Sequence, residues 1–355
     1  MTECELSQKF SRNGIAMHQV DFCRKNDFHS NSSLGNEPKG YKDMSTKTDR
    51  RGFIKTGMAT TAMLALSGPS AVLKAQETTS NKTPDLVVSR GQNPAANARA
   101  AVEGLGGMKR FVKPGSKVVI KPNMSFASGP ERASNTNPQV VREVALMCAE
   151  AGAAKIAVLD NVLNSPQDCL KLSLIPAHLK DVPNTTVSVV QNKRFFRDVP
   201  VKDGQQLTSM SVVADALDAD VLIAVPVGKS HSSSGVSLSM KGMMGLIYDR
   251  LSFHGRYNLH EAIVDMVTVL KPHLVITDGT RILSTGGPGG PGTVIPLNLV
   301  LASPDMVAAD AQMVALGKWY DRKIGPNQVR HIRIAAERGL GVMDLDKLTI
   351  KNIQS

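Results

Sequence analysis

Short runs of β-branched and other apolar residues alternate with amphipathic stretches from residue 85 almost to the C-terminus. Each run is bounded by Pro, Gly or Asp, as is typical of strands, whereas the stretches between them carry apolar residues at helical spacing. The pattern predicts strands at residues 85–89, 117–121, 155–159, 186–190, 221–225, 273–277 and 297–301. It predicts helices at residues 95–111, 138–151, 167–179, 210–217, 259–270, 305–316 and 328–338.

This regular alternation predicts an α/β fold with a largely parallel, doubly wound sheet and helices on both faces, built as one body or as two intimately packed lobes. Helix signals support it, since Pro138 stands at a first helical position after Asn137 and Gly152 follows as a stop. In such folds, ligands bind in a crevice at the carboxyl ends of the strands. We therefore expect the site there.

The N-terminal segment contains Arg50 and Arg51, followed by an uncharged run at residues 56–73, and resembles a twin-arginine export signal. The run holds too many polar and helix-breaking residues for a stable span, so we expect no stable membrane anchor and cleavage near Ala75. The alternative is a helix of the folded domain. Export by this route predicts a periplasmic or otherwise extracytoplasmic location, contact with the twin-arginine translocation machinery, and folding and cofactor loading before export.

Four segments follow from these signals. Residues 1–43 are polar and aperiodic, which indicates a disordered extension or a mis-assigned start, with translation beginning at Met44. Residues 44–75 form the export signal, residues 76–84 a linker and residues 85–355 a single α/β domain. N-terminal sequencing of the precursor decides the start.

Charge and cysteine content narrow the class of ligand. Residues 1–75 hold 11 Lys and Arg and 7 Asp and Glu, so the net charge of +11 becomes +7 for residues 76–355. A basic domain suits an anionic ligand or an anionic envelope surface, although a solvated basic face explains it equally well. We expect no nucleic acid partner, and we interpret the basic-aromatic stretch 193–197 as a strand edge or turn. Cys148 and Cys169 cannot supply four thiolates, so an iron–sulfur cluster is disfavoured; a disulfide between them is an open alternative.

Polar residues gather where four predicted strands end. Lys121 and Asn123 follow one strand, Asp160 a second, residues 226–231 a third and Asp278 a fourth. Such a set at one sheet edge is typical of a site, whereas each end alone is more often a simple turn.

Residues 226–245 carry the strongest candidate chemistry. Lys229 and His231 are two apart on an extended segment, so their side chains point the same way, with Ser230 between them. Lys229 would hold a carboxylate or phosphate, and His231 would transfer protons or bind a metal. Lys241 has apolar neighbours that could depress its pKa, which suits acid–base, Schiff-base or anion-binding chemistry. A surface loop and a snorkelling lysine are the alternatives.

Two further features are candidates. The glycine-rich stretch 286–292, which includes Gly286, Gly287 and Gly289, could approach a ligand closely, close over it as a lid, or serve as a long connection. Asp310 lies in an apolar helical stretch, so an inward-facing carboxylate needs a partner such as Lys229, Lys241 or a metal. His231, Asp278 and Asp310 could meet around a metal, although no spacing demands it.

At residues 226–245 the chain resembles the domain of unknown function 362 family, since Lys229 to His231 and Lys241 to Gly245 look like its lysine–threonine/serine–histidine and lysine–asparagine–x–x–glycine blocks. Departures are Gly242, where asparagine is common, and the absence of the ferredoxin-like cysteine module of some members. The family has no settled general activity, so the resemblance implies a fold rather than a reaction. Further matches in the same order are Lys121-Pro122-Asn123, Thr136-Asn137-Pro138, Ala151-Gly152-Ala153, Asp278-Gly279, Gly286-Gly287-Pro288, Ala309-Asp310 and Gly339-Leu340-Gly341.

The sequence thus favours an exported enzyme that acts on a small anionic ligand by lysine and histidine acid–base chemistry. His231, Lys241 and Asp278 are the catalytic candidates, and the ligand-binding candidates are Lys121, Asn123, Lys229, Ser230, Gly286, Gly287, Gly289 and Asp310. The alternatives are a non-catalytic extracytoplasmic binding protein for an anionic metabolite or cofactor, and a redox carrier of an organic cofactor. No residue pattern identifies a cofactor.

Overall fold

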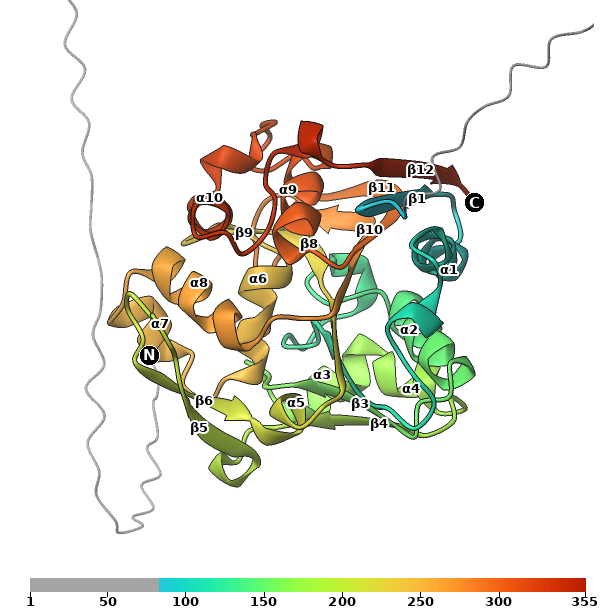
Figure 1. The fold of residues 1–355 in the computed structure, drawn as a ribbon, viewed down its shortest axis with the longest axis horizontal. Coiled ribbons are helices and arrows are strands. Elements are labelled where there is room, and N and C mark those ends of the chain that lie inside the picture. The colour runs from blue at the N-terminus through green and yellow to red at the C-terminus, as the bar shows by residue number, and fades with distance from the viewer. Residues whose placement is uncertain (1–82) are drawn as a thin grey trace, which may run out of the picture. The chain divides into compact units, whose positions relative to one another are not determined.

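A sheet of ten strands runs through the described part of this computed structural model, residues 83–355 (Figure 1). The expected export signal with Arg50 and Arg51, its cleavage site and most of the linker lie outside these residues. The sheet contains β1 (Leu86–Arg90), β2 (Lys117–Pro122), β3 (Lys155–Asp160), β4 (Thr185–Val189), β7 (Val221–Val225), β8 (Val227–His231), β9 (Gly235–Ser237), β10 (Leu274–Leu283), β11 (Val294–Ser303) and β12 (Ile350–Gln354).

The strand order is β12-β1-β11-β10-β7-β2-β3-β4, with β8 pairing with β10 and β9. Neighbouring strands along this order are parallel except at β11, which is antiparallel to both β1 and β10. The expected α/β fold with a largely parallel sheet is confirmed. A separate two-stranded hairpin pairs β5 (Phe196–Pro200) with β6 (Ser209–Val213).

Helices cover both faces of the sheet, as the doubly wound pattern predicted. Strand residues alternate between two apolar clusters, since Val118 and Ile120 belong to one and Val119 to the other. The cluster containing Val118 is covered by α1 (Pro94–Gly104), α2 (Pro138–Glu150) and α4 (Ile175–Leu179). The cluster containing Val119 is covered by α6 (Ser239–Gly242), α8 (Leu259–Val269), α9 (Met306–Leu316) and α10 (Arg330–Glu337) (Figure 1).

The remaining helical elements are short. They are α3 (Pro166–Ser173), α5 (Ala214–Leu217), α7 (Leu251–Gly255), and the 3₁₀ turns η1 (Met108–Arg110), η2 (Pro130–Arg132), η3 (Lys193–Phe195), η4 (Met243–Leu246), η5 (Pro326–Gln328) and η6 (Leu345–Lys347). None of the helices in residues 83–355 combines the length and the apolar character that a membrane crossing requires.

Three predicted helices differ from the structure. The helix expected at 95–111 ends at Gly104, because Gly106 and Gly107 adopt positive φ. The helix expected at 167–179 is two helices, since Pro176 cannot continue a helical hydrogen-bond ladder and Leu174 takes a left-handed conformation. The helix expected at 210–217 is wrong over its first half, where the β-branched residues pair with β5 as strand β6.

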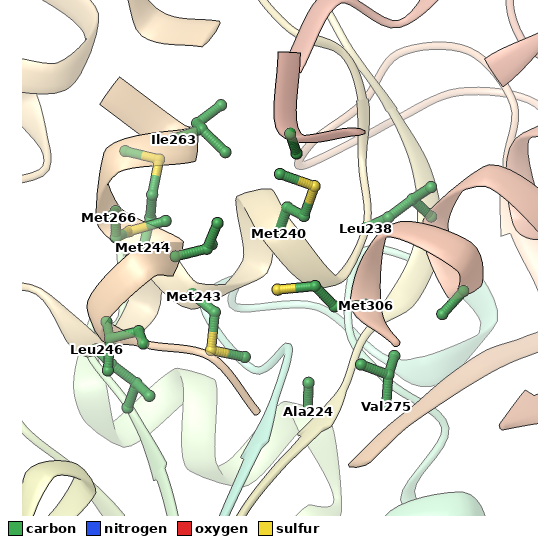
Figure 2. Packing of buried hydrophobic residues seen from close by; sticks show 14 of the residues in the cluster. Ala224, Leu238, Met240, Met243, Met244, Leu246, Ile263, Met266, Val275 and Met306 are labelled. Atoms are coloured by element: carbon green, nitrogen blue, oxygen red, sulfur yellow. The ribbon is translucent and has the colours of Figure 1, made fainter. Parts of the chain in front are cut away.

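Methionines fill much of the space around α6. Met240 of this short helix belongs to the same apolar cluster as Met243, Met244, Met266 and Met306, which lie around it and join it to α8 and α9 (Figure 2). Thioether side chains are flexible enough to fill an irregular gap between elements that differ in length and direction. The packing fixes the turn that carries Lys241. Cys148 and Cys169 are both buried and unpaired, so no disulfide joins them.

Candidate functional site

A cavity of about 280 Å³ opens where several strands of the sheet end. Asn123 follows β2, Asp160 ends β3, and Lys229 and His231 lie on β8, which continues from β7. The expectation that polar strand ends meet at one sheet edge therefore holds for three of the four ends. The full lining is Asn123, Ser125, Phe126, Asp160, Leu163, Lys229, His231, Ser237, Lys241, Gly242, Met244, Gly245, Arg250, Leu251, His254 and Pro288.

Lys229 and His231 face the cavity together, as their spacing on an extended segment predicted. The ammonium of Lys229 donates to the Ser134 carbonyl at 2.6 Å and lies 5.1 Å from the centre of the Phe126 ring. Burial, with a smaller contribution from the nearby Lys121 ammonium, lowers the pKa of Lys229 to about 7. At neutral pH this amine can therefore exist in both protonation states.

Lys241 reaches the same cavity from α6 and is 8% exposed. Its Nζ lies 3.4 Å from Nε2 of His254, a residue of α7. Burial lowers the pKa of Lys241 to about 7, with a smaller contribution from the positive charge of Arg250. The expectation that apolar surroundings depress this pKa is consistent with the structure.

The only carboxylate in the lining of this cavity, within residues 83–355, is Asp160. Its Oδ2 accepts hydrogen bonds from the Met124 amide at 3.0 Å and the Ser125 hydroxyl at 2.8 Å. Its Oδ1 lies 3.2 Å from Nζ of Lys121. Asp160 pairs with Lys121 and also favours the charged forms of Lys229 and Arg250, so a single lining carboxylate faces the charges of these three residues and of Lys241.

His231 is held as a neutral imidazole. Its Nδ1 accepts hydrogen bonds from the backbone amides of Ser233 at 3.1 Å and Ser234 at 3.4 Å, so the ring proton resides on Nε2. Its ring stacks on that of His254 with centroids 5.6 Å apart. Burial, together with the smaller effect of the positive charge of Lys241, lowers the pKa of His231 to about 3. These contacts suit a hydrogen-bond donor better than a proton-transfer base, because protonating Nδ1 would sacrifice both amide donors.

Several expected site residues lie outside the cavity lining. Ser230 points away from it, because alternate side chains of a strand face opposite sides, and its hydroxyl accepts from the Gly287 amide at 3.0 Å. Lys121 lies behind Asp160 as its ion-pair partner. In the glycine-rich loop only Pro288 contributes to the lining. The expected residues that do not line the cavity are Lys121, Ser230, Asp278, Gly286, Gly287, Gly289 and Asp310.

Asp278 and Asp310 have structural partners instead. Asp278 is buried in β10, pairs with Arg281 and accepts from the Asn137 amide at 2.8 Å, which fixes the start of α2. Asp310 accepts from the amides of Ser239 at 2.8 Å and Met240 at 3.0 Å, which caps α6. The prediction that Asp310 pairs with a lysine or a metal was wrong, because backbone amides donate hydrogen bonds to both oxygens of its carboxylate.

His231, Asp278 and Asp310, which could have met around a metal, are not brought together in the structure, since each has separate partners. Within residues 83–355, no group of three or more His, Cys, Asp or Glu side chains is arranged to hold a metal ion.

Sequence reasoning missed some lining residues. Arg250, Leu251 and His254 lie on or beside the short helix α7, whose residues carry no periodic pattern. Phe126 lies in an irregular segment after β2. The only available signal was proximity in sequence to Lys241 for the first three.

Comparison with known proteins agrees with the family resemblance. A thylakoid-associated protein from Synechocystis is 29% identical over 228 residues, which cover 61% of this chain and 67% of that protein. The lactate racemase apoprotein from Thermoanaerobacterium thermosaccharolyticum has a TM-score of 0.45 at 12% identity, over 65% of this chain and 57% of the racemase chain. The model of a domain of unknown function, DUF362, matches residues 118–315, a segment with every cavity-lining residue and more than half of the chain. The chain therefore belongs to the domain of unknown function 362 family.

Proposed function

We propose that the cavity binds a small anion through a carboxylate or phosphate group, and that Lys229 and Lys241 exchange protons with it as the acid–base groups of an enzyme. The observation that carries this proposal is the pair of buried lysines facing one cavity in which, among residues 83–355, the single lining carboxylate is already paired with Lys121. Buried charges are costly unless a partner of opposite sign is present. A bound anion would supply that partner.

The donors around the cavity favour an oxyanion. Lys229, Lys241 and Arg250 provide charged donors, and the tautomer of His231 leaves its Nε2 proton available. Hydrogen bonds to charged groups are shorter and stronger than neutral ones, particularly where water is excluded. These donors converge on one volume, so a single acid group could contact several of them.

The lysine pKa values support acid–base chemistry. An effective acid or base has a pKa near the working pH, and both lysines are lowered to about 7. One protonated lysine would hold the ligand while the other accepts or returns a proton. His231 would then donate a hydrogen bond to a developing oxyanion, a role different from the proton transfer expected from its sequence context.

Calorimetric titration of the full chain with inorganic phosphate and with acetate tests the proposal. An anion stabilises the charged lysines and raises their pKa, so binding at pH 8 should take up at least one proton, seen as heats that differ between buffers of different ionisation enthalpy. Affinity should fall as the pH rises from 7 to 9, by up to about tenfold per unit for each lysine that must be protonated. Absence of binding, or binding without proton uptake, would refute it.

Two variants of the cavity lysines and one surface variant test whether the buried charges bind the anion. Lys229→Met and Lys241→Met remove one buried charge each, whereas Lys171→Met removes an exposed charge on α3. The two cavity variants should weaken anion binding about tenfold or more, and the surface variant should leave it unchanged. If the protein is an enzyme, His231→Ala should reduce the turnover of a bound candidate anion and spare its affinity, whereas in a binding protein only the affinity should suffer.

We also propose export by the twin-arginine route to an extracytoplasmic compartment. Arg50 and Arg51 motivate this proposal, and the thylakoid association of a relative is compatible with it. Replacing both arginines by lysine should retain the precursor in the cytoplasm, as measured by cell fractionation, whereas Lys55→Arg should not. Normal export of the double-lysine variant would contradict this route.

A further inference from the structure

We propose that the ligand is an organic anion with a short apolar body, held with its acid group at Lys229 and Lys241 and its body directed toward the opening. The inference rests on the anion binding proposed above and adds the class of ligand and its orientation.

The cavity volume limits the ligand to a small molecule. A water molecule occupies about 30 Å³ in the liquid, so about 280 Å³ is the volume of roughly nine water molecules. An acid group and a short body fill this space.

Charge is deep in the cavity and apolar surface is at its opening. Lys229 is 2% exposed, whereas Leu163 and Leu251, which also line the cavity, are 54% and 82% exposed. Phe126 and Met244 add apolar surface to the wall. A ligand that reaches both regions must have an acid group at one end and an apolar group at the other.

Two of the neutral polar groups of the wall, Ser125 and Asn123, already have protein partners, which leaves Ser237 as the lining hydroxyl open to a hydroxyl-rich ligand. The Ser125 hydroxyl donates to Asp160, and the side-chain oxygen of Asn123 accepts from the Val227 amide at 3.0 Å. A sugar-like body would give up its hydrogen bonds to water and find few acceptors here, which weakens binding. An apolar body makes no hydrogen bonds to water, so it loses none on binding.

The two exposed leucines are the part of the wall that such a body would cover. Removing apolar surface from water favours binding in proportion to its area. Partial burial of one leucine side chain by a ligand corresponds to an affinity change of about tenfold. The surface of Leu163 and Leu251 should therefore distinguish ligands with an apolar body from plain anions.

The test compares two pairs of probes by calorimetry with the full chain: inorganic phosphate with phenyl phosphate, and acetate with phenylacetate. We expect the aromatic member of at least one pair to bind about tenfold tighter or more. The pair that binds tighter identifies the acid group. Leu163→Ser and Leu251→Ser should each weaken the aromatic probe about five- to tenfold and leave the plain anion unchanged, whereas Leu172→Ser, an exposed leucine on α3, should change neither.

The outcomes distinguish a failure of the apolar-body inference from a failure of the proposed anion binding. Equal affinity of plain and aromatic probes, or no effect of either leucine variant, would overturn the apolar body while leaving the anion site intact. If the wild-type protein binds no probe, or if Lys229→Met binds them equally well, anion binding itself fails and the inference fails with it.

Discussion

Lys229→Met should change how stability depends on pH. Lys229 is buried, and its pKa falls from the ordinary 10.5 to about 7 in the folded protein. Between pH 7 and 10.5 the folded state has therefore lost a proton that the unfolded state keeps. Stability rises with pH wherever the unfolded state binds more protons, so Lys229 adds about 1.4 kcal/mol per pH unit in this window.

The size of the effect follows from the same difference. A shift of about 3.5 units corresponds to a total on the order of 5 kcal/mol, which is the full cost of the buried charge below pH 7. From pH 7 to pH 9 the wild-type protein should gain about 2–3 kcal/mol from Lys229 alone. The methionine variant loses this gain. It also leaves the Ser134 carbonyl without its donor, so the slope reports the charge better than the stability at one pH.

Urea unfolding of the full chain, followed by circular dichroism at pH 7, 8 and 9, measures the slope. The exposed Lys171→Met variant serves as the control and should follow the wild type. Saturating anion should flatten the wild-type curve, because a bound anion keeps the lysine protonated. Parallel curves for the wild type and Lys229→Met would refute the assignment of a depressed pKa to this lysine.

Two glycines of one turn should respond differently to substitution. Gly242→Ala should fold normally, since a Cβ there would meet Asn123 Nδ2 at 3.8 Å, and differential scanning calorimetry should show little change. Gly245→Ala should destabilise the fold by several kcal/mol, because its Cβ would overlap the carboxylate of Asp160; an unchanged melting temperature would contradict this packing. Asp310→Asn should lower the free energy of unfolding by about 1–3 kcal/mol in urea titrations, since its NH₂ group would face an amide that now donates to the carboxylate; full stability would show that this cap is dispensable.

Much of the fold could be predicted because its pattern is local. The β-branched runs and their Pro, Gly and Asp boundaries located the central strands, and two-residue spacing placed Lys229 and His231 on one side of β8. The same alternation excludes Ser230 from that side, so its assignment to the site was avoidable. Strand β8 itself was not expected, because Gly-Lys-Ser-His is typical of a loop.

Pairing between distant elements could not be predicted. Asp160 was recognised as a strand end, but its ion pair with Lys121 depends on the registration of β2 against β3. Asp310 was expected to need a charged partner, and only the tertiary structure shows that the amides starting α6 satisfy it. Arg250 entered the cavity from an irregular segment that has no periodicity to interpret.

Strand β8 serves two sides at once, since Lys229 and His231 face the cavity and Ser230 holds the loop at Gly287. A one-residue insertion or deletion within it would exchange these sides, turning both basic groups toward the loop and the hydroxyl toward the ligand. The number of residues between Pro226 and the β8–β9 turn is therefore constrained more tightly than their chemical identity, and tolerance to length changes should be lowest there.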